Sequence, residues 1–148
     1  MPFSISFRPL AASAGSWYQE TAVDLSRFGV HATPRPGVSL HDLEDAIDGV
    51  ITDVGLHGVT AEELERAKSR MVADYIYAQD SQSTLARIYG GALTTGSSVE
   101  QVRSRPQRIR AVTADAVRAA AKQWLDKRRS VTGYLVKDVT VRREDKRS

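Results

Sequence analysis

The 148-residue chain has no cysteine, 41% hydrophobic and 26% charged residues, and a formal net charge of +3, a composition typical of one globular domain. The lack of cysteine excludes a disulfide framework, a thiolate nucleophile, an iron–sulfur cluster and a cysteine-built zinc site. No run approaches the roughly 20 apolar residues that span a bilayer, so no membrane partner is expected. Ala12-Ser13-Ala14 imitates a signal-peptidase site, but Arg8 and Pro9 interrupt the stretch before it. No signal peptide is therefore expected, and a cytoplasmic location follows by default.

The net charge hides a division along the chain. Residues 1–100 carry 7 Lys/Arg and 13 Asp/Glu, a charge of −6, whereas residues 101–148 carry 14 and 5, a charge of +9. Such asymmetry indicates a nucleic-acid face, an acidic partner, or two parts of one molecule that attract each other.

Two short runs of aromatic and β-branched residues, 14–20 and 24–33, predict strands. The following Pro34-Arg35-Pro36-Gly37 ends them, because proline withholds a ladder N–H and disfavours helix at the residue before it.

Helical signals follow. Ser39 with Asp42 predicts the start of a helix that ends near residues 55–58, and Thr60 with Glu63 forms a capping box for the next one. The apolar stripe predicted for the second helix is Leu64, Ala67, Met71, Tyr75 and Ala78.

A third helix is expected over about residues 81–95, with Gly96 as its left-handed C-cap. Its Gly90-Gly91 pair costs about 2 kcal/mol of helix propensity, which predicts a close approach by another backbone. A short helix after Ser97 or Ser98 must stop or kink near Pro106. The residues expected to face inward on the third helix are Leu85, Ile88, Tyr89, Ala92 and Leu93.

Thr113 is expected to cap a fifth helix with the stripe Val117, Ala120, Ala121, Trp124 and Leu125, ending in three basic residues at 127–129. Residues 131–136 then read as a buried strand. The predicted fold class is α+β, an antiparallel sheet covered by several helices. Residues 1–138 form one domain in this interpretation, and residues 139–148 form a charged tail.

Only three histidines are available for metal chemistry. His41 begins a segment that approaches the H-x-x-E-H zinc motif, but its fifth position is Asp45, so one imidazole ligand is missing. A solvated acidic first turn is the preferred interpretation, and His31 and His57 are read as structural. The chain also lacks a G-x-S-x-G elbow and a Walker lysine.

The basic residues of the last third raise the hypothesis of nucleic-acid binding. The aromatic residue among them, Trp124, falls on an apolar stripe, so a solvated or paired face is preferred and nucleic acid is not the expected partner. These basic residues are Arg103, Arg105, Arg108, Arg110, Arg118, Lys122, Lys127, Arg128 and Arg129.

Five stretches taken in order carry a family resemblance: GVTAEELERAK at 58–68, YAQD at 77–80, ARIYG at 86–90, VTAD at 112–115 and SVTG at 130–133. They resemble the C-terminal domain of pitrilysin-type (inverzincin) zinc peptidases, which include insulysin and the mitochondrial processing peptidase. Residues 34–40 resemble the joint between a strand and a helix in that domain. The likeness extends over about residues 10–136, and the ordered set is far more specific than one capped helix.

The resemblance implies two similar αβ domains, of which the first holds zinc and the second closes a peptide chamber over it. This chain resembles only the later part of a second domain, so no cofactor is expected in it, and zinc is expected only in a complementary domain. The family's Arg and Tyr pair, seven residues apart, would fall at Ile5 and Ala12 and is therefore absent. Tyr18 is a possible contact with the chamber, with an aromatic on a sheet face as the alternative.

The family domain is longer at its N-terminus, so a truncated domain with an uncovered sheet edge is expected. The leading hypothesis is a non-catalytic part of a zinc metallopeptidase that acts in scaffolding or peptide enclosure. Its partners would be a zinc-bearing peptidase chain, a peptide substrate or further copies of itself. The alternatives are a self-associating interaction module without a peptidase role, and a nucleic-acid-binding basic face.

Overall fold

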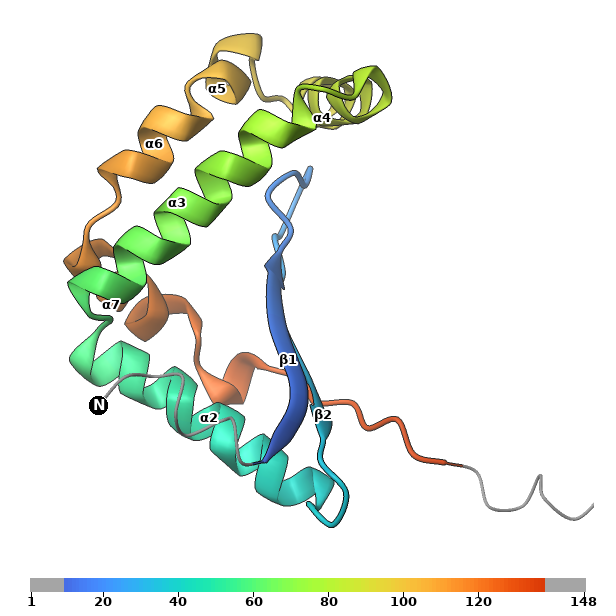
Figure 1. Ribbon diagram of the computed structural model, residues 1–148, viewed down its shortest axis with the longest axis vertical. Coiled ribbons are helices and arrows are strands. Elements are labelled where there is room, and N and C mark those ends of the chain that lie inside the picture. The colour runs from blue at the N-terminus through green and yellow to red at the C-terminus, as the bar shows by residue number, and fades with distance from the viewer. Residues whose placement is uncertain (1–9, 138–148) are drawn as a thin grey trace, which may run out of the picture.

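The computed structural model describes residues 10–137 and confirms the α+β fold class (Figure 1). The described part contains a two-stranded antiparallel sheet, six α-helices and one 3₁₀ helix. In chain order these are β1 (Ala11–Tyr18), β2 (Phe28–Pro34), α2 (Leu40–His57), α3 (Ala61–Ala78), α4 (Gln82–Thr94), α5 (Val99–Arg103), α6 (Arg105–Ala111), α7 (Ala114–Trp124) and η1 (Lys127–Arg129).

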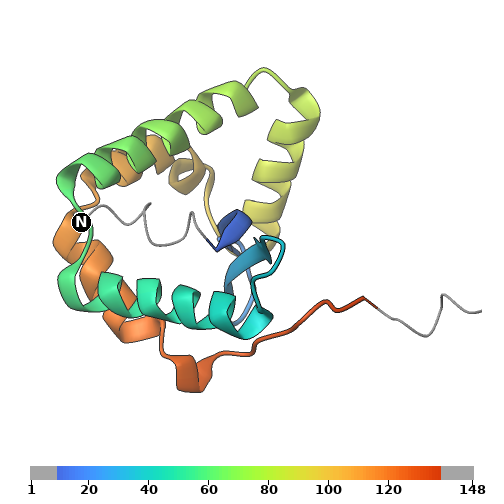
Figure 2. The ribbon, with the colours of Figure 1, turned by 60° about the horizontal axis from the view of Figure 1, so that its bottom comes forward.

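The elements are arranged as an open frame. Helices α2 and α7 pack together at one end, α3 and α6 run along one side, and α4 with α5 occupies the other end (Figures 1 and 2). The β1–β2 hairpin forms the side opposite α3, with β2 beside α2 (Figure 1). Among the described helices, none is both long and apolar enough to cross a membrane.

The two predicted strands are confirmed, although the first covers Ala11–Tyr18 rather than residues 14–20 and the second begins at Phe28 rather than at residue 24. Trp17 pairs with Gly29 across the hairpin. A Cβ placed on Gly29 would lie 2.4 Å from Cε2 of Trp17, so only glycine leaves room for the indole at this position. Aromatic contact with the backbone thus helps to set the register of the hairpin.

The predicted caps are present. The Asp42 amide donates to the Ser39 hydroxyl at 3.0 Å at the start of α2. Thr60 and Glu63 form both halves of a capping box, at 2.9 and 3.2 Å. Further caps at Ser98 and Thr113 start α5 and α7 as expected.

We expect the change Thr60→Ala to destabilise the protein by about 1 kcal/mol, because it leaves an amide of the first turn of α3 without its hydroxyl acceptor. Urea unfolding followed by circular dichroism measures this. Thr52→Ala is the matched control, since Thr52 is exposed inside α2, where alanine favours helix. Equal effects of the two changes would contradict a role for the cap.

The predicted apolar stripes are only partly correct. Val72 is buried on α3, whereas Met71 is 48% exposed, and on α4 Ala92 is buried while Leu93 is exposed. Trp124 of α7 is exposed as well. The described sheet has only two strands, so each helix buries only the narrow strip that touches a neighbouring element.

The close approach predicted for Gly90 and Gly91 is wrong. A Cβ on Gly90 would meet no atom within 4 Å, and one on Gly91 would touch only the Thr21 side chain at 3.9 Å. We therefore expect Gly90→Ala to stabilise the protein by up to about 1 kcal/mol through helix propensity.

Gly96→Ala is the control for that measurement. Gly96 has a φ of +87° at the end of α4, where an alanine side chain is strained, so this change should lower the denaturation midpoint. A lower midpoint for Gly90→Ala would show that the backbone at residue 90 is constrained after all.

The short helix predicted after Ser98 stops at Arg103, before Pro106, as expected. The second short helix, α6, was missed, although Pro106 in its first turn is a known start signal. The basic run 127–129 is not the last turn of α7, which ends at Trp124; it forms η1, capped by the side chain of Asp126.

The strand predicted over residues 131–136 is wrong. This segment pairs with neither strand among residues 10–137, and Val131 and Leu135 are 99% and 97% exposed. An apolar segment becomes a buried strand only where a sheet edge is close enough to pair with its backbone. Here the segment lies against α2 instead. The predicted tail, 139–148, lies outside the described residues.

The described core is thin. Its buried hydrophobic residues are Ala11, Leu43, Val72, Ala92, Val102 and Ala121. Five of these six are alanine or valine, each from a separate element, and among described residues no side chain has less than 2% exposure.

Candidate functional site

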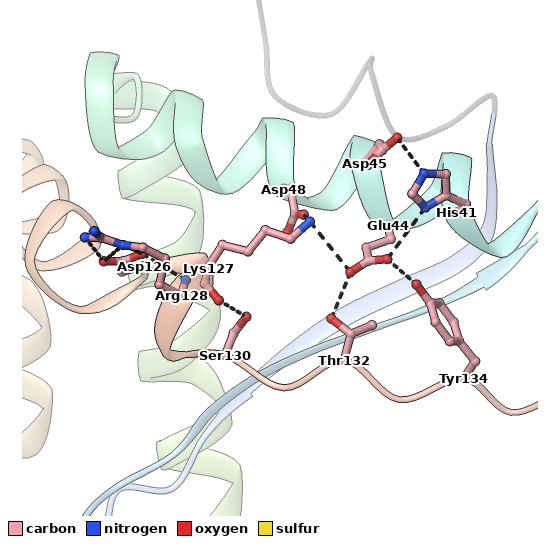
Figure 3. Close-up of polar contacts among 10 residues, drawn as sticks. All are labelled: His41, Glu44, Asp45, Asp48, Asp126, Lys127, Arg128, Ser130, Thr132 and Tyr134. Carbon is pink, nitrogen blue, oxygen red and sulfur yellow. Dashed lines mark hydrogen bonds and ion pairs between the residues drawn. The ribbon is translucent and has the colours of Figure 1, made fainter.

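The most connected polar group in the described part is the carboxylate of Glu44, on the second turn of α2. It accepts hydrogen bonds from the Thr132 hydroxyl at 2.9 Å and from the Tyr134 hydroxyl (Figure 3). Lys127 lies 3.7 Å from Glu44 and also contacts the carboxylate of Asp48. We call Glu44, Asp48, Lys127, Thr132 and Tyr134 the Glu44 cluster.

The cluster changes the proton affinity of its members. The hydrogen bonds from Tyr134 and Thr132, with the charge of Lys127, lower the pKa of Glu44 despite some loss of hydration. The hydrogen bond to Asp48 raises the pKa of Lys127, and the bond to Glu44 raises that of Tyr134. Since all of these effects favour the paired forms, the cluster fastens residues 127–134 to α2 and is not poised for acid–base catalysis.

The residues that approach a zinc motif do not fit zinc. His41 lies 4.0 Å from Glu44 and 3.7 Å from Asp45, so one imidazole and two carboxylates share this turn of α2. The Glu44 oxygens are already occupied by Thr132 and Tyr134. Over residues 10–137, no group of three or more histidine, aspartate or glutamate residues could hold a metal ion.

The other histidines have local partners. His57 Nδ1 lies 2.5 Å from the Asp53 carboxylate one turn earlier on α2. The His31 ring lies over Gly15 in the hairpin, where a Cβ would be 2.7 Å from its Cε1. Both positions agree with the structural interpretation.

Two concave surfaces adjoin Tyr75 of α3. The first, of about 240 Å³, lies between α3, α4 and α6, and the second, of about 470 Å³, is lined by residues of α3, α4, α5 and α6. The first is lined by Met71, Asp74, Tyr75, Ala78, Ile88 and Arg105, and the second by Tyr75, Gln79, Leu85, Tyr89, Arg103 and Pro106.

The Tyr75 ring, which lines both pockets, is held by its hydroxyl, which donates to the Val102 carbonyl at 3.2 Å. Arg105 is held by Glu20 at 2.6 Å, which ties the loop between β1 and β2 to α6. The pocket linings thus combine aromatic and aliphatic side chains with the carboxylate of Asp74 and the guanidinium group of Arg103, while Arg105 is already paired with Glu20.

The basic residues of the last third do not form one uniform free face. Lys127 pairs with acidic groups of α2, and Arg105 pairs with Glu20 of the hairpin loop. Arg118 and Arg128 pair locally, with Asp115 and Asp126. The division of charge therefore reflects, at least for Lys127 and Arg105, the attraction between two parts of one molecule. Nucleic-acid binding stays the less favoured alternative.

Tyr18, the predicted chamber contact, is the last residue of β1 and pairs with Phe28. Its side chain is 61% exposed, and the alternation of the strand puts it on the same face as Phe28 and Val30. A contact with peptide at Tyr18 stays a prediction.

Sequence reasoning missed the Glu44 cluster and the pockets at Tyr75. Glu44 meets partners 88 and 90 residues later in the chain, a pairing without local signal. Tyr75 was assigned to a core stripe, but the position of Arg105 beside it depends on how α6 packs on α3.

Comparison with known proteins places this architecture among proteins named as zinc proteases. The chain is 32% identical over 126 residues to an uncharacterized zinc protease of Streptomyces coelicolor. That match covers 84% of this chain but only 27% of the relative, so the chain spans about a quarter of its length. No known protein-family model matches the chain.

Two solved structures share the fold. One is the inactive peptidase domain of a protein from Bordetella parapertussis named as a zinc protease, with a TM-score of 0.70 and 15% identity over 93% of this chain and 74% of that one. The other, from Bordetella pertussis Tohama I and also named as a zinc protease, has a TM-score of 0.67 and 18% identity over 80% of this chain and 65% of that one. The chain is thus related in sequence or fold to proteins named as zinc proteases.

Proposed function

We propose that this chain forms part of a non-catalytic, peptidase-like domain of a pitrilysin-type zinc protease, and that it encloses peptides beside a separate zinc-bearing domain. The observation that carries the proposal is the likeness of 93% of the chain to an inactive peptidase domain, at a TM-score of 0.70. The order of the helices and their caps agrees with the family resemblance of the sequence. Relation to the C-terminal domains of that family, including the mitochondrial processing peptidase, is part of this proposal.

The lining of the two pockets supports a peptide-binding role. The Tyr75 ring and the aliphatic walls offer apolar contact, while Arg103 offers a partner for a carboxylate. In this role the chain's residues bind and orient a peptide, and hydrolysis belongs to the zinc-bearing partner. A zinc-bearing peptidase chain is therefore the proposed partner.

Zinc analysis and peptide digestion of the pure protein test the catalytic side of the proposal. After dialysis we expect less than one zinc ion per chain. We also expect no chelator-sensitive cleavage of a mixed set of fluorogenic peptides. Stoichiometric zinc together with chelator-sensitive cleavage would refute the non-catalytic assignment.

Fluorescence anisotropy with a labelled peptide rich in Phe and Asp tests the binding side. Arg103→Ala removes a guanidinium from the larger pocket and should weaken binding several-fold. Arg110→Ala is the matched control, because Arg110 is exposed on α6 and lines neither pocket. Equal binding by the two variants would contradict a role for the pocket.

A further inference from the structure

Residues 131–136 have the features of a strand without a partner. Their sequence, VTGYLV, contains no charge and no proline and is rich in β-branched and aromatic residues. Within residues 10–137, their backbone groups make no hydrogen bond to another backbone group. Six residues is also the usual length of a strand in a globular protein.

Side-chain contacts hold this segment with one face toward α2. Thr132 and Tyr134, two residues apart, both bond to Glu44, so they share one face of an extended chain (Figure 3). Val131 and Leu135 belong to the opposite face and are 99% and 97% exposed. The segment is thus fixed in place by one face, with its other face uncovered.

The same chain contains an open edge to receive such a strand. The described sheet has two strands, and β2 is the one packed beside α2, which leaves the outer edge of β1 the more accessible. Natural edge strands are protected by charged residues, proline or bulges. The sequence of β1, AASAGSWY, has no charge and no proline, and its one irregularity, between Ala11 and Ser13, leaves the later residues regular.

Large apolar side chains are exposed on both elements. On the hairpin these include Trp17, Tyr18 and Phe28, and in the segment they are Val131, Tyr134, Leu135 and Val136. Apolar side chains that gather at the surface of a donor segment and of an acceptor hairpin are typical of an interaction surface.

We propose that residues 131–136 of one copy add to the outer edge of β1 in a second copy, and that the reciprocal exchange forms a two-fold symmetric dimer. Each copy supplies one donor strand and one acceptor edge, so a single two-fold axis allows both strand additions to form at once. The contacts to Glu44 keep the donor extended before pairing. This proposal does not depend on a peptidase role.

Sedimentation velocity over a hundredfold range of concentration tests the proposal on the whole chain. We expect a dimer that dissociates on dilution, and backbone amides at 131–136 whose hydrogen exchange slows at least tenfold as the dimer forms. A monomer throughout the range, or a dimer in which these amides stay unprotected, would overturn the proposal.

The variant Leu135→Pro removes one ladder N–H and should abolish the dimer. Because Leu135 is 97% exposed, the variant monomer should keep the circular dichroism spectrum of the unaltered protein.

Leu135→Lys and Leu56→Lys form a second, milder pair of variants. Leu56 is the matched control position, since it is an exposed apolar residue on α2 outside the segment. Leu135→Lys should weaken the dimer and Leu56→Lys should not. A dimer that persists in Leu135→Pro, or that responds equally to the two lysine variants, would show that another surface associates.

Discussion

The change Leu43→Ala is expected to destabilise the protein by about 2–5 kcal/mol, the range for a leucine truncated inside a core. Leu43 is 3% exposed, the lowest value in the described core. It lies in the first turn of α2, the helix that packs against both α7 and β2. Because globular proteins are stable by only about 5–15 kcal/mol, this single change should remove a large part of the stability.

Urea unfolding at pH 7 measures this effect, and Leu56→Ala is the control. Leu56 occupies the other end of the same helix and is 63% exposed, so its truncation should change stability by less than about 0.5 kcal/mol. Similar effects of the two changes would show that the first turn of α2 is not packed as described.

Acid is expected to release residues 131–136 from α2. The pKa of Glu44 lies below its ordinary value of 4.5, because the ionised carboxylate accepts hydrogen bonds from Tyr134 and Thr132. A carboxyl group with a lowered folded-state pKa contributes stability that is present above the unfolded-state pKa and is lost as pH falls through the folded-state value. The release should therefore begin near pH 4.5 and continue below it.

The neighbouring η1 should stay folded while the segment is released. Its cap, Asp126, remains ionised at these pH values because hydrogen bonds from Arg128 lower the pKa of Asp126 from 3.8 to about 2. Above neutrality the Glu44 cluster should remain intact until the Tyr134 hydroxyl ionises. Because the hydrogen bond to Glu44 raises the pKa of Tyr134 above 10, the contact should persist through pH 10 and be lost only at higher pH.

Backbone order parameters from NMR relaxation, recorded from pH 7 to pH 2.5 at a concentration where the protein is monomeric, follow the release directly. Glu44→Ala should show the low order parameters of the released segment at every pH. Asp45→Ala is the matched control, because Asp45 is an exposed carboxylate on the same turn with His41 as its partner, and this variant should keep the transition. A transition that survives in Glu44→Ala would assign the release to another group.

Local signals predicted much of the fold. The caps at Ser39, Thr60, Ser98 and Thr113 act within three residues of the backbone amides they satisfy, so their effect is encoded in neighbouring positions. The turn at Pro34–Gly37 and the two strands before it were found for the same reason. The resemblance to zinc peptidases used the order of these local elements, and the fold of the solved neighbours agrees with it.

Whether an apolar stripe becomes buried depended on elements distant in sequence. Met71 and Val72 are adjacent on α3, yet Met71 is 48% exposed and Val72 is buried. The strand predicted at residues 131–136 shows the same limit, since an apolar extended segment pairs only if an edge lies within reach. The Glu44 cluster joins residues 88 and 90 positions apart, and no periodicity marks such a pair.

The amino-acid sequence by itself determined where most of the helices begin, where the second strand ends, and that the last third carries excess positive charge, because capping, turn geometry and composition are local properties. Only the tertiary structure decided that Lys127 and Arg105 neutralise acidic groups elsewhere in the chain, that Tyr75 lines two pockets, and that residues 131–136 pair with neither described strand. These outcomes depend on the packing of elements far apart in sequence, since burial and pairing require a second surface whose position no short stretch of residues specifies.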